Sequence, residues 1–202
     1  MENNTSKSFL RDPQNIIAIA VSLISICALF VSIKQTQIMS EQRALMYEQA
    51  QAAVWPRLEI GISKGHSKKD YSVNLFNFMI VNGGVGPAII TDTRVTYDKK
   101  TIRYWGDLFE AFNLPKDTPL FYANVSLNNS VIKIGESYAF LSLTENLPVA
   151  QGFYDNREKV TVEIWYESIY GDQWKLTYNN KESKIEEVHS QFSLPEEEQF
   201  KD

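Results

Sequence analysis

The sequence predicts an α+β fold, with an N-terminal transmembrane helix and its helical extension followed by a mainly antiparallel β-sandwich. Three observations lead to this prediction. Residues 16–33 are uncharged and almost wholly apolar, the next stretch up to Trp55 contains neither glycine nor proline, and from Arg57 onward apolar residues alternate with period two. A chain of 202 residues has room for one ordinary domain besides such a helix.

The apolar stretch 16–33 is long enough to cross a bilayer, because its residues span about 27 Å as a helix and the hydrocarbon core is about 30 Å thick. No small-x-small cleavage site follows it, which argues against a signal peptide. We therefore expect a polar tail at 1–14 and an uncleaved transmembrane helix at 15–34. Lysine and arginine counts on the two sides nearly tie, so charge does not decide the orientation.

The helix should continue past the membrane as a juxtamembrane linker helix at 35–55, because this stretch is rich in helix-forming residues. Apolar pairs recur every seven residues at Ile38/Met39, Leu45/Met46 and Ala52/Ala53, a short heptad-like pattern. Pro56 should end the helix, since the residue before a proline is pushed out of the α region.

Residues 56–180 are predicted to form the β-sandwich domain. Its short strands are separated by turn signals, a pattern typical of the immunoglobulin-like type. Tyr104–Leu114 breaks the alternation with apolar residues at helical spacing and predicts a short inserted helix. Trp165 is expected in the core between the sheets. The remaining stretch, 181–202, has three lysines against seven carboxylates and predicts an acidic flexible tail.

The glycines of "NGGVGPA" (82–88) raise the question of a phosphate-binding loop. Such loops need a helix N-terminus behind the glycines, whereas here a strand-like run follows. The spacing matches neither G-x-x-x-x-G-K-[ST] nor G-x-G-x-x-G. We therefore interpret the stretch as a loop between two strands, in which Asn82, Gly83 and Gly84 tolerate positive φ and Pro87 ends strand pairing.

"NGGVGPA" after one strand and "VEIWYESIYGDQW" as a late hairpin resemble a recurring bacterial β-sandwich module over roughly Ala52–Asn180. The layout as a whole is similar to the membrane effector subunit of the Hailong anti-phage system. That resemblance implies an oligomeric, ion-conducting effector in the bacterial inner membrane. It also implies a cytoplasmic domain and a nucleotide or oligonucleotide ligand made by a partner nucleotidyltransferase.

The residues available for catalysis or metal binding are few. The chain has one cysteine, Cys27, and two histidines, His66 and His189, and it contains no H-x-x-x-H, H-x-E or G-x-S-x-G motif. Glu163 and Glu167 fall on one strand face, as expected of a polar outer face. We therefore predict no enzyme activity, no cofactor and no metal.

The loop 63–72 is the densest basic cluster of the chain. It offers two interpretations: a site for an anionic ligand such as phosphate or anionic lipid, or a solvated hairpin loop. An oligomer would bring several copies of these side chains around one axis. The candidate residues for an anionic ligand are Lys64, His66, Lys68 and Lys69.

Small and polar residues form a stripe along one line of the helix when residues are placed at 100° intervals. Three explanations remain open: packing against another helix, the lining of a water-filled pore, or hydroxyl groups bonded to their own helix. Arg43, at the end of the stripe, would form a charged ring near the membrane surface in an oligomer. The candidate residues are Ser22, Ser25, Leu29, Ser32, Thr36 and Arg43.

Together these patterns predict a non-enzymatic homo-oligomer that associates through its transmembrane helix in the lipid bilayer. Its β domain would sense a ligand or partner and control the membrane segment, in the concrete version as a pore-forming effector of anti-phage defence. The alternative is a single-pass anchor or accessory subunit that tethers a partner protein and conducts no ions.

Overall fold

The computed structural model describes residues 13–112, 114–115, 118–144, 147–189 and 192–201. These residues divide into two compact units, one ending at Ala50 and one beginning at Gln51. The predicted polar tail at 1–14 lies almost entirely outside the described residues.

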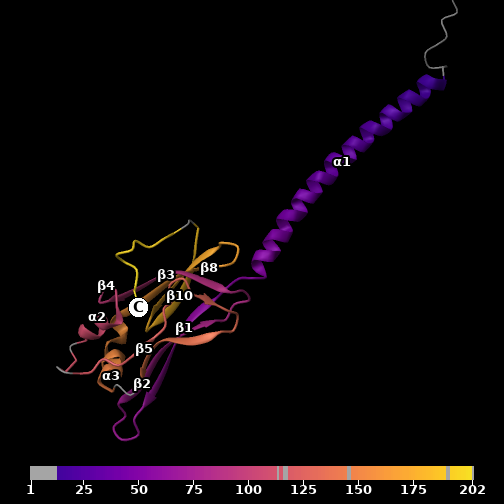
Figure 1. Cartoon of the computed structure of the whole chain (residues 1–202). Helices are drawn as coiled ribbons and strands as arrows, with labels where there is room; N and C mark the ends of the chain where they lie inside the picture. Colours follow the sequence, from indigo (N-terminus) through magenta and orange to yellow (C-terminus); the bar gives the residue numbers. More distant parts are fainter. Residues whose placement is uncertain (1–12, 113, 116–117, 145–146, 190–191, 202) are drawn as a thin grey trace, which may run out of the picture. The chain divides into compact units, whose positions relative to one another are not determined.

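The first unit is formed by a single helix, α1 (Pro13–Ala52), which confirms that the helix continues beyond the predicted span (Figure 1). Proline is well tolerated at a first helical position, and nothing in the helix interior interrupts the hydrogen-bond ladder. The helix is long and apolar enough to cross a membrane, and none of its residues is buried within the chain. A soluble core helix would be buried, whereas α1 is not, and α1 is a candidate membrane span by its length and composition.

The second unit is a mostly antiparallel β domain, as predicted, and its described strands form two sheets. The first sheet has the order β1-β2-β7-β5, and the second has the order β10-β9-β8-β3-β4, with β6 paired to β3. The strands are β1 (Leu58–His66), β2 (Val73–Asn82), β3 (Ala88–Tyr97), β4 (Lys100–Ile102), β5 (Ala123–Asn124), β6 (Val131–Ile132), β7 (Ser137–Thr144), β8 (Val160–Glu167), β9 (Gln173–Asn179) and β10 (Glu182–Val188).

The two sheets share one hydrophobic core, to which the longer strands such as β2 and β8 contribute alternate residues. Phe78 of β2 meets Tyr178 of β9 edge-on across the core, at 5.8 Å between ring centroids. Phe78 also stacks on Phe140 of the neighbouring strand β7. These aromatic side chains supply much of the apolar area that the domain buries.

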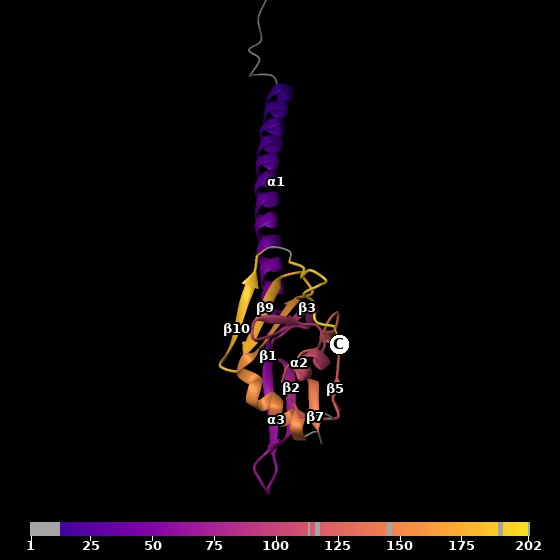
Figure 2. The same cartoon turned by 90° about the vertical axis from the view of Figure 1, so that its left-hand side faces the viewer.

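Two short helices complete this core. The predicted insert is present as α2 (Trp105–Glu110), with Trp105, Leu108 and Phe109 buried. A second helix, α3 (Leu147–Asn156), was not predicted, and its Phe153 lies 4.6 Å from the Phe76 ring. α3 leads through a 3-10 turn, η2 (Arg157–Lys159), into β8. Figures 1 and 2 both show α3 beside the β1–β2 hairpin.

The prediction of a flexible tail at 181–202 is wrong. Glu182–Val188 forms the edge strand β10, visible beside β9 in Figure 2. Farther along, Leu194 and Phe200 are almost fully buried. The prediction failed because it rested on charge, whereas the few apolar side chains of this segment lie on the domain.

Candidate functional site

The hydroxyl groups of the predicted stripe are bonded within their own helix. Ser22 donates to the Ala18 carbonyl at 2.8 Å, Ser25 to the Val21 carbonyl at 2.8 Å, and Thr36 to the Ser32 carbonyl at 3.0 Å. Association of helices therefore does not need these hydroxyls as donors, and the small size of the side chains becomes the stronger argument for close packing. Leu29, Ser32 and Arg43, the other residues of the predicted stripe, are exposed on α1.

The predicted basic loop is the hairpin between β1 and β2. It is closed by local bonds: Ser67 N–H donates to the Ser72 carbonyl at 2.8 Å, and Ser72 Oγ donates to Asp70 at 2.8 Å. This hydroxyl, with a second from Ser67, lowers the pKa of the Asp70 carboxyl. Lys68 and Lys69 are exposed at the tip of the hairpin.

Lys64 and His66 lie farther down the same hairpin, against α3. The Lys64 ammonium lies 5.0 Å from the centre of the Tyr154 ring, and the His66 ring meets it edge-on at 6.5 Å. Arg157 of η2 lies 4.0 Å from the centre of the same ring. The structure thus brings Lys64, His66 and a cation that the sequence did not single out, Arg157, to one tyrosine.

The glycine stretch forms a loop between β2 and β3, as predicted, but it also holds the chain where it enters the β domain. We call Asn82–Pro87 the junction loop and Val54–Arg57 the junction segment. Val85 N–H donates to the Trp55 carbonyl at 2.9 Å, and Gly83 N–H donates to the Arg57 carbonyl at 2.9 Å. The two backbones therefore run against each other as closely as paired strands.

Asn82 is the polar centre of the junction loop and is fully buried. Its side-chain oxygen accepts from the Gly84 and Arg57 N–H groups, at 3.0 and 3.3 Å. Its amide nitrogen donates to the Gly86 and Ile132 carbonyls, at 2.8 and 3.0 Å. One side chain thus satisfies groups from three segments, which makes it costly to replace.

Glycine is required in the junction loop because of this close approach. A Cβ on Gly86 would lie 1.8 Å from the Val54 carbonyl oxygen, and one on Gly84 would lie 2.4 Å from the Arg57 nitrogen. Both contacts are to backbone, which cannot rotate away. Close approach of another backbone is a recognised reason for glycine beside a strand, and the sequence alone did not show which backbone it was.

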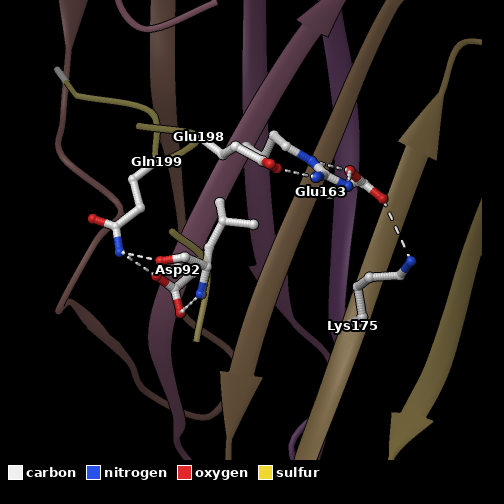
Figure 3. A network of polar contacts seen from close by, with 7 residues as sticks. Asp92, Glu163, Lys175, Glu198 and Gln199 are labelled. Carbon is white, nitrogen blue, oxygen red and sulfur yellow. Dashed lines mark hydrogen bonds and ion pairs between the residues drawn. The ribbon is translucent and has the colours of Figure 1, made fainter. Parts of the chain in front are cut away.

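The outer face of the second sheet carries a network of charged side chains (Figure 3). Arg94 of β3 pairs with Glu163 of β8 at 2.6 Å and with Glu198 at 2.6 Å, and Lys175 of β9 pairs with Glu163 at 3.4 Å. Burial lowers the pKa of the Arg94 guanidinium, but hydrogen bonds to the two glutamates outweigh burial, so its pKa is raised. Glu163 thus lies on a polar outer face, as predicted.

Residues 192–201 cross this outer face, and we call them the C-terminal strap. Gln199 donates to Asp92 at 2.8 Å, and Phe200 N–H donates to the Thr93 carbonyl at 2.8 Å. Phe192 stacks on Trp165 at 5.0 Å between ring centroids. Trp165 is therefore buried beneath the strap and not between the sheets, because it shares the strand face of Glu163.

An open groove of about 760 Å³ lies between the strap and the sheet. Two carboxylates, Asp92 and Glu167, line it together with the amides of Asn128, Gln173 and Gln199. A smaller hollow of about 450 Å³ contains Glu167, Asp172, Glu187 and His189. Acidic linings repel phosphate, so neither hollow suits the anionic ligand predicted from the hairpin lysines.

The described part of the chain contains no group of three or more His, Cys, Asp or Glu side chains placed to hold a metal ion. The two histidines are far apart in the fold, since His66 ends β1 and His189 follows β10.

In comparisons with known proteins, no protein-family model matches the chain, and no curated protein matches it significantly.

Proposed function

We propose that the chain is a membrane-anchored, non-enzymatic protein that self-associates and whose β domain controls its membrane helix. In its concrete version it is a pore-forming effector of bacterial anti-phage defence, located in the inner membrane with its β domain in the cytoplasm. The immunoglobulin-like type of the β domain and a homo-oligomer formed through α1 belong to the same proposal.

The observation that carries this proposal is the junction loop. A tether between an anchor and a domain needs only a flexible linker. Here the junction segment is bonded on both sides of Pro56, and Gln51 Nε2 also donates to Asp172 in the β8–β9 turn at 3.1 Å. A segment held in this way moves with the loops of the domain, and we propose that it is the route by which the domain controls the membrane segment.

The predicted anionic ligand would act at the β1–β2 hairpin, at the opposite end of the domain. Lys64, His66, Lys68 and Lys69 provide the charge, and Arg157 adds a further cation beside Tyr154. A nucleotide or oligonucleotide, supplied by a partner nucleotidyltransferase, is the ligand class that this charge fits.

A second function is favoured by the hydroxyl groups of the stripe. Because Ser22 and Ser25 are bonded to their own helix, they can face lipid at little cost. This observation fits a single-pass anchor that holds a partner protein at the membrane without conducting ions.

One substitution separates the two functions. The stretch 16–33 is replaced by an unrelated leucine-rich helix of equal length, and the membrane potential of expressing cells is followed with a voltage-sensitive dye. The effector function requires that the wild-type chain depolarises cells and that the replacement abolishes depolarisation. Depolarisation by neither chain, with both retained in the membrane fraction, supports the anchor function.

A further inference from the structure

The end of the β domain that receives the junction segment carries exposed apolar side chains on its loop tips. Trp55 is 42% exposed, Val85 56%, Ile134 59% and Ile169 55%. We call these residues the apolar collar. Each belongs to a different loop: the junction segment, the junction loop, the β6–β7 turn and the β8–β9 turn.

Hydrogen bonds place these loops at one end of the domain. Val85 is bonded to Trp55, and Gly135, which follows Ile134, donates to the Asn82 carbonyl at 2.9 Å. The turn that holds Ile169 is joined to Gln51 through Asp172. The collar is therefore one region of the surface and not a scatter of single exposed residues.

The β1–β2 hairpin, at the other end of β2, has a loop tip of different composition. The β1–β2 hairpin carries serine, lysine and aspartate, with Tyr71 as its exposed aromatic residue. The exposed side chains of Val85, Ile134 and Ile169 are not among those that form the core. Such a surface is typical of a contact with an apolar partner.

A long helical stretch separates the collar from the apolar span in the sequence. The helical stretch 34–52 follows the apolar span without a break and is about 28 Å long at about 1.5 Å per residue. Trp55 comes three residues after the helix ends, and an extended chain of that length reaches back only about 10 Å. A stretch of this length between the span and the collar favours a protein partner over the bilayer.

A second copy of this chain is a suitable apolar partner for the collar. Chains anchored by identical spans have the same direction in the bilayer, so the β domains of neighbouring copies meet at high effective concentration. The same stretch of chain also leaves Ile38, Met39, Leu45 and Met46 exposed on α1.

We propose that the apolar collar is a self-association surface, on which the collar of one copy packs against the collar of the next. This inference rests on the membrane anchoring and self-association of the proposed function, and it adds the surface through which β domains touch. Contact at this end would join the junction segments of neighbouring copies, so that their helices respond together.

Cysteine crosslinking of the full-length chain in phospholipid vesicles tests the inference. Cys27 is the only cysteine, so a Cys27→Ala background makes each introduced thiol unique. We expect Val85→Cys and Ile169→Cys to give disulfide-linked dimers at least about fivefold more efficiently than Lys69→Cys. The Lys69 variant is the matched control, since this residue is exposed at the opposite end. Equal efficiency at both ends overturns the inference.

A second variant keeps the test independent of thiol chemistry. Val85→Asp combined with Ile169→Asp should lower the particle mass in mild detergent, whereas Tyr71→Asp should leave it unchanged, with circular dichroism confirming the fold of each. If the wild-type chain itself is monomeric, the self-association of the proposed function fails. If the wild-type oligomer persists unchanged in the double variant, only the collar inference fails. Quenching by brominated lipid of a fluorophore on the Val85→Cys variant would assign the collar to the bilayer and also overturn it.

Discussion

Strand β2 connects two loops of opposite character. They differ in whether their hydrogen bonds stay within the loop or reach distant segments of the chain. At Val73 it meets the basic hairpin, whose tip is exposed and closed by bonds among its own residues. At Asn82 it meets the junction loop, whose central side chain is fully buried and bonded to three separate segments. The hairpin is held by contacts among neighbouring residues, whereas the junction loop is held by tertiary contacts with distant segments.

The difference teaches that residue chemistry and structural importance are separate properties. The hairpin has the charged residues that attract attention in a sequence. In the structure they are exposed to solvent or lie against one tyrosine, Tyr154. The junction loop consists of an amide, glycines and a valine, yet it determines how the domain holds its incoming chain. Substitutions at the two ends of β2 should therefore have very unequal effects.

Asn82→Ala is expected to have the largest effect. It leaves the Arg57 and Gly84 N–H groups and the Gly86 and Ile132 carbonyls without their partner in a buried site. Since each buried group left unpaired costs roughly 1–3 kcal/mol and some will reach water, we expect a loss of about 4 kcal/mol of unfolding free energy. Denaturant unfolding of the full chain in micelles, followed by tryptophan fluorescence, measures it.

The matched control for this variant is Asn124→Ala, because Asn124 is exposed on the short edge strand β5. It should change the unfolding free energy by less than about 0.5 kcal/mol. Similar losses in the two variants would mean that the buried amide network does not hold the junction loop together.

Gly86→Ala should have the next largest effect, because its methyl group would lie 1.8 Å from the Val54 carbonyl oxygen. Relief requires the junction segment to move off the loop, at an expected cost of about 3 kcal/mol, the upper range for overpacking. The displaced segment should also become a better protease substrate, so limited trypsin digestion should cleave faster after Arg57.

Gly106→Ala is the control for the glycine prediction, because a Cβ at that position meets nothing within 4 Å. Alanine there should stabilise α2 slightly, by up to about 1 kcal/mol. An unchanged trypsin cleavage rate in Gly86→Ala would show that the loop adjusts around the methyl group, and the contrast between the two ends of β2 would weaken.

Much of the fold was predictable from the sequence because it follows from local patterns. The long helix, the alternating strands and α2 each have a periodicity that one element can satisfy alone. α3 was missed because Pro148 and Gly152 suggest a loop. Proline is nevertheless compatible with a first helical turn, and Gly152 makes room for Leu114, whose Cδ2 atom would lie 2.6 Å from a Cβ.

The candidate site was less predictable because its contacts join distant parts of the chain. The glycines of the junction loop were recognised as a turn, but their close approach to Val54 has no local signature. The prediction for the C-terminal strap was wrong for the same reason. Its charge predicts a solvated tail, and only the assembled sheet shows where Leu194 and Phe200 are buried. The prediction that Trp165 lies between the sheets was wrong for a different reason, because Glu163, two residues earlier on the same strand face, already indicated an outward direction.

Lys68→Ala combined with Lys69→Ala should have the smallest effect on stability, less than about 0.5 kcal/mol. Both side chains are exposed, and the bonds that close the hairpin come from Ser67, Asp70 and Ser72. The same unfolding measurement used for Asn82→Ala checks this expectation, and a comparable loss would break the contrast between the ends of β2. If the double variant keeps its stability, any loss of binding to an anionic ligand reports on charge at the hairpin, because the fold is unaltered.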